Sequence, residues 1–309
     1  MENYKITPKI SVVMPVFNSE EYLSTAIESV IDQSFEDFEF LIIYDDSNDK
    51  SLKIIESYAL IDPRIKIIKG DNDGISGALN KGFDFSKGKF IIRMDADDIC
   101  MNNRFKEQLK HVIENDLDIC GSHSIIINNL GCANGFFTAP ISHDSCTLAL
   151  AFEVPFSHPS VIIRKDFIDK HYLRYRRSKF IKAEDYDLWI RMHERGAKFG
   201  NNNKALIKYR VLDNSLSRLN TKNVMRDTKV LSNNFFKLNY DLNLKNVESI
   251  LAQSNSKERI LVGRFLVTNL TRLRFKKICL LKYIRFKEII YVVISEILKR
   301  TRFFLSKFS

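Results

Sequence analysis

The sequence predicts an α/β fold: a sheet flanked by helices, followed by a C-terminal helical extension. Short runs of β-branched and aromatic residues end abruptly at polar or acidic residues, as buried strands do. Segments with helical apolar spacing separate these runs, and helical patterns dominate from Thr221 onward. Strands that alternate with helices form βαβ units, so we expect parallel pairing with right-handed crossovers.

The composition is that of a folded protein. The chain has 309 residues, of which 45% are hydrophobic and 28% are charged, and this argues against disorder. Its five cysteines show no CxxC spacing, which argues against a disulfide framework and a zinc site and favours a reducing compartment. The N-terminus has no apolar stretch of signal-peptide length, so we expect a cytoplasmic protein.

The first strand and helix are predicted near the N-terminus. The run KISVVMPVFN, which starts at Lys9, predicts a buried strand that is ended by Pro15 and Asn18. In the next segment, Ser19 is a candidate N-cap. The apolar residues that follow share one helical face: Leu23, Ile27, Val30 and Ile31.

Two further strands and a helix follow the same pattern. Residues 38–44 predict a second strand, which runs into Asp45 and Asp46. Residues 51–60 predict a helix, and residues 65–68 predict a third short strand.

The fourth predicted strand, within KFIIRMDADDI, stops at three carboxylates: Asp95, Asp97 and Asp98. These groups repel one another, so they need a cation, hydrogen-bond donors or open water nearby. Hard oxygen ligands at the end of a strand suit Mg²⁺ or Mn²⁺. A solvated acidic turn is the alternative.

Three predicted strand ends are expected to meet at one edge of the sheet. Residues 15–17, 45–46 and 95–98 follow the first, second and fourth strands. Ligands of open α/β sheets bind beyond the carboxyl ends of the strands. The three segments together therefore indicate a binding site.

A glycine-containing segment, residues 70–82, is expected to cross this edge. Gly74 and Gly77 would let the backbone approach a phosphate, and Lys81 or Arg93 would add positive charge there. Ordinary loop chemistry with solvated cations is the alternative.

The middle of the chain has weaker patterns. We expect a helix over 103–114, strands over 117–120, 124–128 and 156–163, and a mobile loop over the site at 131–145. His158 is either a ligand or phosphate contact, or a structural histidine before a proline.

A second acidic motif, AEDYDLWIR, starts at Ala183 and predicts a helix with Glu184 and Asp185 at its beginning. Acids are common at helix starts because of the macrodipole. The functional interpretation is a carboxylate that accepts a proton from an incoming hydroxyl. Arg210 and Arg218 further on would help to neutralise phosphate or would be solvated.

The basic charge is concentrated at the C-terminus. Residues 220–309 hold 19 Lys and Arg against 6 Asp and Glu, whereas residues 1–219 have a small acidic excess. Basic and apolar residues alternate near the end without an apolar run of about 18 residues. We expect a catalytic domain over 1–219 and a basic helical region over 220–309 that lies on an anionic membrane. A helical hairpin on the first domain, or a homodimer contact, is the alternative.

In these motifs the chain resembles the family-2 inverting glycosyltransferases, which have the mixed-sheet GT-A fold. The likeness covers about residues 9–218. It rests on five segments in the family's order: ISVVMPVFNSEEYL, FEFLIIYDDSNDKS, GISGALNKGF, KFIIRMDADD and AEDYDLWIR. One departure is the turn Asp45-Asp46-Ser47-Asn48-Asp49, which is one residue shorter than the family's usual Asp-Asp-Gly-Ser-Thr-Asp and lacks glycine.

The resemblance implies a role for each matching residue. Asp46 would bind the base, most simply uracil. The nucleotide pocket would be lined by Pro15, Phe17 and Glu20. Asp97 would bind Mg²⁺ or Mn²⁺, Asp95 would bind the metal or the ribose of the donor, and Asp98 would be a further ligand. Asp185 would be the general base, with Glu184 beside it.

The leading functional hypothesis is therefore a glycosyltransferase on the inner face of the cytoplasmic membrane. It would move a sugar from a UDP-sugar to a saccharide or lipid-linked acceptor in the synthesis of capsule, O-antigen or lipooligosaccharide, with no nucleic-acid partner. A nucleotidyltransferase with the same fold is one alternative. The other is a non-catalytic binder of nucleotide sugars or nucleic acid that uses the basic tail.

Overall fold

The structure is a computed structural model that describes residues 7–176, 183–212, 221–253, 258 and 260–265. Its elements up to the acidic motif are β1 (Ile10–Val16), α1 (Leu23–Ile31), β2 (Phe38–Tyr44), α2 (Ser51–Ile61), β3 (Ile65–Lys69), α3 (Gly74–Phe85) and β4 (Phe90–Arg93). The middle of the chain forms β5 (Ile99–Cys100), α4 (Arg104–Glu114), β6 (Ile119–Ile127), β7 (Ala133–Phe137) and α5 (His143–Ala149). The 3₁₀ helix η1 (His158–Ser160), β8 (Ile162–Arg164), α6 (Lys165–Lys170), α7 (Glu184–Glu194), β9 (Phe199–Arg210), α9 (Thr221–Leu238) and α10 (Tyr240–Ala252) follow.

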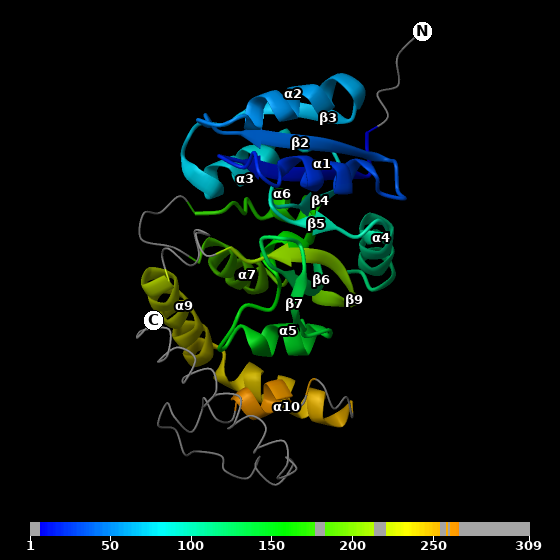
Figure 1. The fold of residues 1–309 in the computed structure, drawn as a ribbon. Helices are drawn as coiled ribbons and strands as arrows, with labels where there is room; N and C mark the ends of the chain where they lie inside the picture. Colours follow the sequence, from blue (N-terminus) through cyan, green and yellow to red (C-terminus); the bar gives the residue numbers. More distant parts are fainter. Residues whose placement is uncertain (1–6, 177–182, 213–220, 254–257, 259, 266–309) are drawn as a thin grey trace. The chain divides into compact units, whose positions relative to one another are not determined.

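The strands form one mixed sheet, as predicted (Figure 1). Its order is β3-β2-β1-β4-β8-β6-β9-β5, with β7 paired to β6. The pairs β1–β2, β1–β4 and β2–β3 are parallel, whereas β8 runs antiparallel to both β4 and β6. Strand β4 therefore joins the parallel half of the sheet to a mixed part, in which β6 and β9 are parallel to each other.

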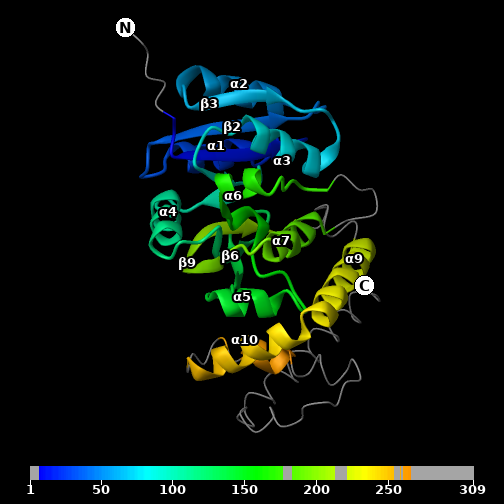
Figure 2. The ribbon, with the colours of Figure 1, turned by 180° about the vertical axis from the view of Figure 1, so that it is seen from behind.

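Strand β1 is buried on both faces because helices cover each side of the parallel half. Its alternate residues Ile10, Val12 and Met14 belong to a core that also contains α1 and Phe105 of α4. Val13, between them, faces Gly82 of α3 on the other side. The near-continuous apolar sequence of β1 follows from this double coverage. Figure 2 shows the same layers from behind.

By its contacts the chain divides into two compact units. One contains the residues up to Ile141 together with Val154–Leu231, and the other contains Ser142–Glu153 together with the residues from Ser232 onward. In the second unit α5 packs against α10, and the Arg264 guanidinium lies 2.6 Å from the Glu153 carboxylate. The predicted boundary at residues 219 and 220 stays a prediction.

Several local predictions are wrong. The predicted loop at 131–145 contains β7, paired with β6, and the start of α5. The predicted strand at 156–163 contains the 3₁₀ helix η1, and strand pairing begins only at Ile162 in β8. Ser19 does not cap α1, which begins at Leu23 after a turn in which the Tyr22 N–H donates to the Ser19 carbonyl. In each case, pairing or packing with distant residues outweighs the local pattern.

No helix among the described residues is long and apolar enough to cross a membrane. The strongly basic segment near the C-terminus, residues 266–309, lies outside the described part of the chain.

Replacement of Gly82 by Ala tests how closely α3 packs on β1. An added Cβ would lie 2.2 Å from Cγ1 of Val13, a buried side chain with little freedom to move. We expect the free energy of unfolding to fall by about 1–3 kcal/mol in urea titrations. The exposed α2 variant Lys53→Ala is the control, and equal stability of both variants would contradict the close packing.

Candidate active site

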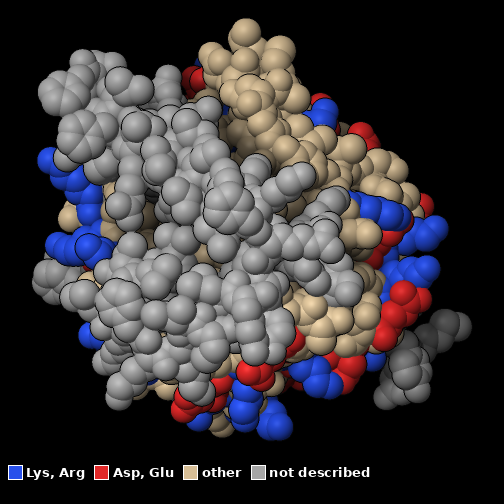
Figure 3. Space-filling model, turned by 90° about the horizontal axis from the view of Figure 1, so that it is seen from below, with Lys and Arg blue, Asp and Glu red and all other residues tan. Residues whose placement is uncertain are grey.

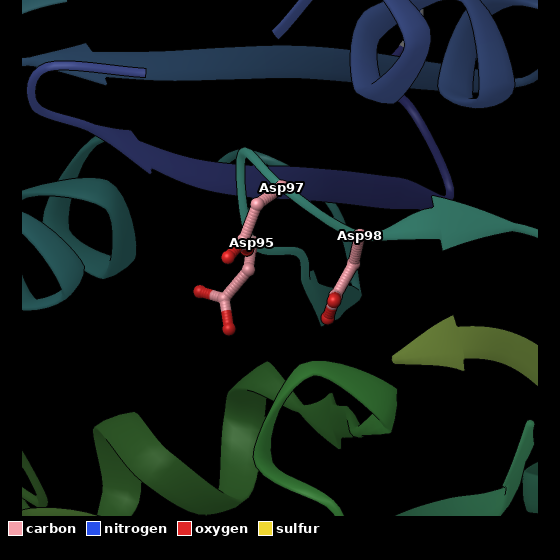
Figure 4. A group of neighbouring side chains, drawn as sticks. All are labelled: Asp95, Asp97 and Asp98. Carbon is pink, nitrogen blue, oxygen red and sulfur yellow. The ribbon is translucent and has the colours of Figure 1, made fainter. Parts of the chain in front are cut away.

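Three carboxylates form an acidic cluster in the turn after β4. Single oxygen atoms of Asp95, Asp97 and Asp98 all lie within 4.8 Å of one another. Figure 4 shows the three side chains projecting from this one turn. Asp98 is fully buried, whereas Asp95 and Asp97 keep part of their surface exposed. The cluster is thus open on one side.

The cluster has the properties of a cation site. Burial and the charge of Asp95 raise the pKa of Asp97 to about 6, and burial with both neighbouring acids raises the pKa of Asp98 well above its usual range. Asp98 Oδ1 accepts the Arg210 N–H at 2.7 Å, but its buried Oδ2 has no hydrogen-bond partner in the part of the chain that the structure describes. A divalent cation would relieve the repulsion and take up this oxygen, so the residues fit such an ion.

Arg93 is the last residue of β4 and lies next to the cluster. Its buried guanidinium forms an ion pair with Asp95, and its Nε has no partner among the described residues. Arg104 Nη2 donates to the Arg93 carbonyl at 2.9 Å and to the Pro159 carbonyl at 2.8 Å. The backbone of Arg93 is therefore held by Arg104, and its guanidinium lies against the carboxylate of Asp95.

Arg210, at the end of β9, supports the cluster. Its guanidinium donates to the carbonyl of Asp97 at 2.7 Å and to the carbonyls of Asn128 and Asn129 at 2.9 and 3.0 Å. The same group lies 4.1 Å from the centre of the Tyr22 ring. With these donors engaged, Arg210 holds the turn in shape and is not placed as a free phosphate ligand. Arg218 lies outside the described residues.

The ends of β1 and β2 lie side by side, as the parallel register requires. Pro15 is partly buried, and Phe17 is 59% exposed just beyond β1. The Glu20 carboxylate accepts the Lys50 N–H at 2.9 Å, and the Asn18 side chain accepts the Asn48 N–H at 2.9 Å. Hydrogen bonds between the two loops thus hold the shortened turn that follows β2.

Asp46 lies at the exposed end of β2 and is held by Asn72. The Asn72 side chain donates to the Asp46 carboxylate and accepts the Asp46 N–H, both at 2.9 Å. Hydrogen bonds from Asn72 and Lys69 lower the pKa of Asp46. Lys81, the predicted phosphate contact on α3, forms an ion pair with Asp71 at 2.6 Å. The sequence analysis missed Asn72, whose only local signal is its place in a turn-rich loop.

The second acidic motif forms the first turn of α7. Glu184 and Asp185 are both partly exposed, and Asp185 Oδ1 accepts the Tyr186 N–H at 2.7 Å. Burial and the neighbouring Glu184 raise the pKa of Asp185 to about 7, while the charge of Arg93 acts in the opposite direction. A carboxyl group with this pKa can accept a proton near neutral pH.

His158 lies between the acidic cluster and α7. Its Nε2 is 2.9 Å from the Tyr175 hydroxyl, and its ring packs against Trp189 of α7. Burial and the Arg93 charge hold the pKa of His158 well below its usual range, so the ring is neutral. Of the two interpretations of this histidine, its contacts favour the structural one. The sequence analysis missed Tyr175, for which there is no local signal.

Comparison with known proteins assigns the family. The sequence model of the protein family "Glycosyl transferase family 2" matches residues 11–173. The chain belongs to this family. An uncharacterized glycosyltransferase of Methanocaldococcus jannaschii, MJ1057, is 36% identical over 220 residues, which cover 69% of this chain and 74% of that protein.

Two Escherichia coli relatives have more informative names. The O-antigen biosynthesis glycosyltransferase WbnJ is 30% identical and is matched over 69% of this chain and 84% of its own length. The UDP-Glc:alpha-D-GlcNAc-diphosphoundecaprenol beta-1,3-glucosyltransferase WfgD is 28% identical, with 72% of this chain and 85% of WfgD covered. This family-2 protein is accordingly a glycosyltransferase.

Solved structures share its GT-A fold. S. aureus TarS 1-349 aligns with a TM-score of 0.58 and 20% identity, covering 84% of this chain and 79% of that one. TarS 1-349 in complex with UDP-GlcNAc gives a TM-score of 0.57 at 18% identity, again over 84% of this chain and 79% of that one. The mannosyltransferase PcManGT from Pyrobaculum calidifontis, in complex with GDP-Man and Mn²⁺, gives 0.56 at 12% identity over 86% and 81%.

Replacement of Asp98 by Asn tests the cation site without an activity assay. Because Asn is neutral and a weaker ligand, we expect Mn²⁺ affinity to fall about 10- to 100-fold in calorimetric titration. Asp84→Asn, which removes an exposed carboxylate outside the cluster, is the charge-matched control and should bind Mn²⁺ as the wild type does. Unchanged affinity in Asp98→Asn would remove Asp98 from the ligand set.

Proposed function

We propose that this glycosyltransferase is an inverting enzyme. It would move a sugar from a UDP-sugar to a hydroxyl group of a saccharide or lipid-linked acceptor in cell-envelope glycan synthesis. The observation that carries the proposal is that the charge of Arg93 acts on two acidic sites, the cluster after β4 and the start of α7. The cluster after β4 suits a cation, Asp185 of α7 has a pKa of about 7, and the Arg93 charge acts on the pKa of both Asp97 and Asp185.

In this proposal the acidic cluster holds the diphosphate end of the donor. Asp97 would bind Mg²⁺ or Mn²⁺, Asp95 would bind the metal or the ribose, and Asp98 would be a further ligand. When bound, the cation would neutralise the charge that develops on the leaving nucleoside diphosphate. Arg93 would hold Asp95 in place through their ion pair. Because the Arg93 side chain is buried, this role is favoured over direct contact with phosphate.

The loops at the ends of β1 and β2 would form the nucleotide pocket. Pro15 and the exposed Phe17 would lie against the base or ribose, and Asp46 would accept the N3–H of uracil. Glu20 would shape the pocket through its hydrogen bond to Lys50 N–H. Lys81 would reach the phosphates by exchanging its ion pair with Asp71.

Asp185 would act as the general base. An acceptor hydroxyl is a poor nucleophile, so a carboxylate on the side opposite the leaving group has to take its proton during attack. Displacement in line with a single base inverts the anomeric centre, so an α-linked donor gives a β-linked product. Glu184 would keep the pKa of Asp185 high enough for proton transfer.

The names of the relatives support the donor and the acceptor class. WfgD is named for UDP-Glc and for an acceptor linked to diphosphoundecaprenol, and WbnJ is named for O-antigen biosynthesis. The TarS complex with UDP-GlcNAc supports a uridine donor. We therefore infer a lipid-linked saccharide as the acceptor and a location at the inner face of the cytoplasmic membrane.

Membrane contact is proposed for the basic C-terminal region. Residues 266–309 hold 11 Lys and Arg against 2 Asp and Glu. In Figure 3, acidic and basic side chains of the described residues lie interspersed along the lower and right edges of the view. The charge asymmetry that would attract anionic lipid thus lies mainly in residues 266–309. A homodimer contact through the same region is the alternative.

Asp185→Asn tests the proposed chemistry. Wild-type protein is incubated with Mn²⁺, a lipid-linked saccharide and a panel of UDP-sugars, and UDP release is measured. Loss of the base should lower kcat by about 10²- to 10⁴-fold while donor binding is retained. Below about pH 7 the wild-type kcat/KM should fall because Asp185 becomes protonated. In the variant this acid limb should disappear.

Two further measurements separate the alternative functions. With UTP and a sugar 1-phosphate in place of the UDP-sugar, release of pyrophosphate would indicate a nucleotidyltransferase. Binding of UDP-sugar without turnover would indicate a non-catalytic binder. Full activity of Asp185→Asn would contradict the assignment of the base.

Liposome flotation tests the membrane proposal. Full-length protein should float with anionic vesicles at low salt and dissociate as salt rises, whereas a variant that ends at residue 269 should stay in the soluble fraction. Neutral vesicles are the control. Equal recovery of both proteins on anionic vesicles would contradict a role of residues 270–309 in membrane binding.

A further inference from the structure

The backbone of Tyr175 is hydrogen-bonded to α3, the helix that packs on β1. The Tyr175 N–H donates to Asn80 Oδ1 of α3 at 2.7 Å, and Asn80 Nδ2 donates to the Tyr175 carbonyl at 2.8 Å. The ring packs on Phe83, with 5.5 Å between the ring centres, and the residue is 2% exposed. The position of the Tyr175 hydroxyl is therefore determined by α3.

This hydroxyl shares a hydrogen bond with His158. The oxygen lies 2.9 Å from His158 Nε2, and both groups are neutral because burial raises the pKa of Tyr175 and lowers that of His158. The His158 ring meets the Trp189 ring edge-on at 6.0 Å. Trp189 is one helical turn after Asp185 on α7, so His158 contacts the helix that carries the base.

The residues that follow His158 are connected to the end of β4. Arg104 Nη2 donates both to the carbonyl of Arg93, which precedes the cluster, and to the carbonyl of Pro159. Gln108 Nε2 donates to the Ser160 carbonyl at 2.7 Å. The short helix η1 that carries His158 is thus held against the end of β4.

A second set of bonds ties the neighbours of Tyr175 to α7. The buried Asp187 carboxylate accepts from Arg176 Nη1 at 3.1 Å and from Arg191 Nε at 2.8 Å. Arg191 also donates to the Arg174 carbonyl at 2.8 Å. The segment around Tyr175 therefore contacts α3, η1 and α7 at the same time.

We propose that His158 and Tyr175 are positioning residues that hold the base Asp185 at a fixed separation from the acidic cluster. The inference rests on the proposed function, in which leaving group and base act on opposite sides of one carbon atom. An error of about 1 Å in such a geometry can cost about 10²-fold in rate. Ordinary core packing would give the pair a role in stability alone.

Tyr175→Phe is the direct test, because it removes one hydroxyl and keeps the ring. We expect kcat to fall about tenfold, with KM and the dissociation constant for the donor within about twofold of wild type. Tyr58→Phe is the matched control, since it removes a hydroxyl bonded to Glu28 on the surface of α1 and α2, and it should leave kcat unchanged. Unchanged kcat in Tyr175→Phe would overturn the proposal.

Two variants at His158 separate positioning from stability. Gln can place an amide near the site of Nε2, so His158→Gln should keep most of kcat, whereas His158→Leu should resemble Tyr175→Phe. If kcat and donor affinity fall in all three variants only in proportion to the loss of folded protein, the role is structural and the proposal is wrong.

Amide hydrogen exchange tests the positioning role of Tyr175 independently of the proposed function. Amides in the first turn of α7 should exchange faster in Tyr175→Phe than in wild type, while those of α2 should not change. If wild-type protein turns over no UDP-sugar, the proposed function fails, and the exchange result still decides whether the pair positions α7. Equal exchange in the first turn of α7 would overturn the positioning role.

Discussion

Arg93 is a buried guanidinium beside a turn that carries three carboxylates. Without a nearby cation, burying such acids would be costly, and the raised pKa values of Asp97 and Asp98 reflect how burial and mutual repulsion oppose their ionised forms. The ion pair with Asp95 offsets part of this cost. The charge of Arg93 also reaches Asp185 and His158, so one residue influences both halves of the candidate site.

The sheet explains why Arg93 can occupy this position. Strand β4 is the element at which parallel pairing with β1 changes to antiparallel pairing with β8. The acidic turn follows β4, while η1 precedes β8 on the neighbouring strand. Arg104 connects β4 to η1 through the carbonyls of Arg93 and Pro159. A cluster at this junction therefore lies near both the loops that follow β1 and β2 and the segment that leads to α7.

Much of the site is built from arginines that hold other residues in place. Arg210 donates to three carbonyls around the cluster, Arg104 connects β4 to η1, and Arg191 with Arg176 holds Asp187. Guanidinium groups suit this use because several donors lie in one plane. Arg210 and Arg104 join segments that lie far apart in the sequence, and both leave the carboxylates of Asp95 and Asp97 partly exposed.

The sequence by itself determined the alternation of strands and helices, the acidic cluster after β4 and the acids at the start of α7. These features depend on periodicity and charge within a few residues, which can be read locally. Only the tertiary structure decided that 131–145 contains β7, that Arg210 donates to the carbonyl of Asp97, that Asn72 is bonded to Asp46, and that Tyr175 is bonded to His158. Those outcomes depend on partners tens of residues away, as for Asn80 with Tyr175. The pKa of Asp185 likewise depends on burial, which exists only in the folded chain.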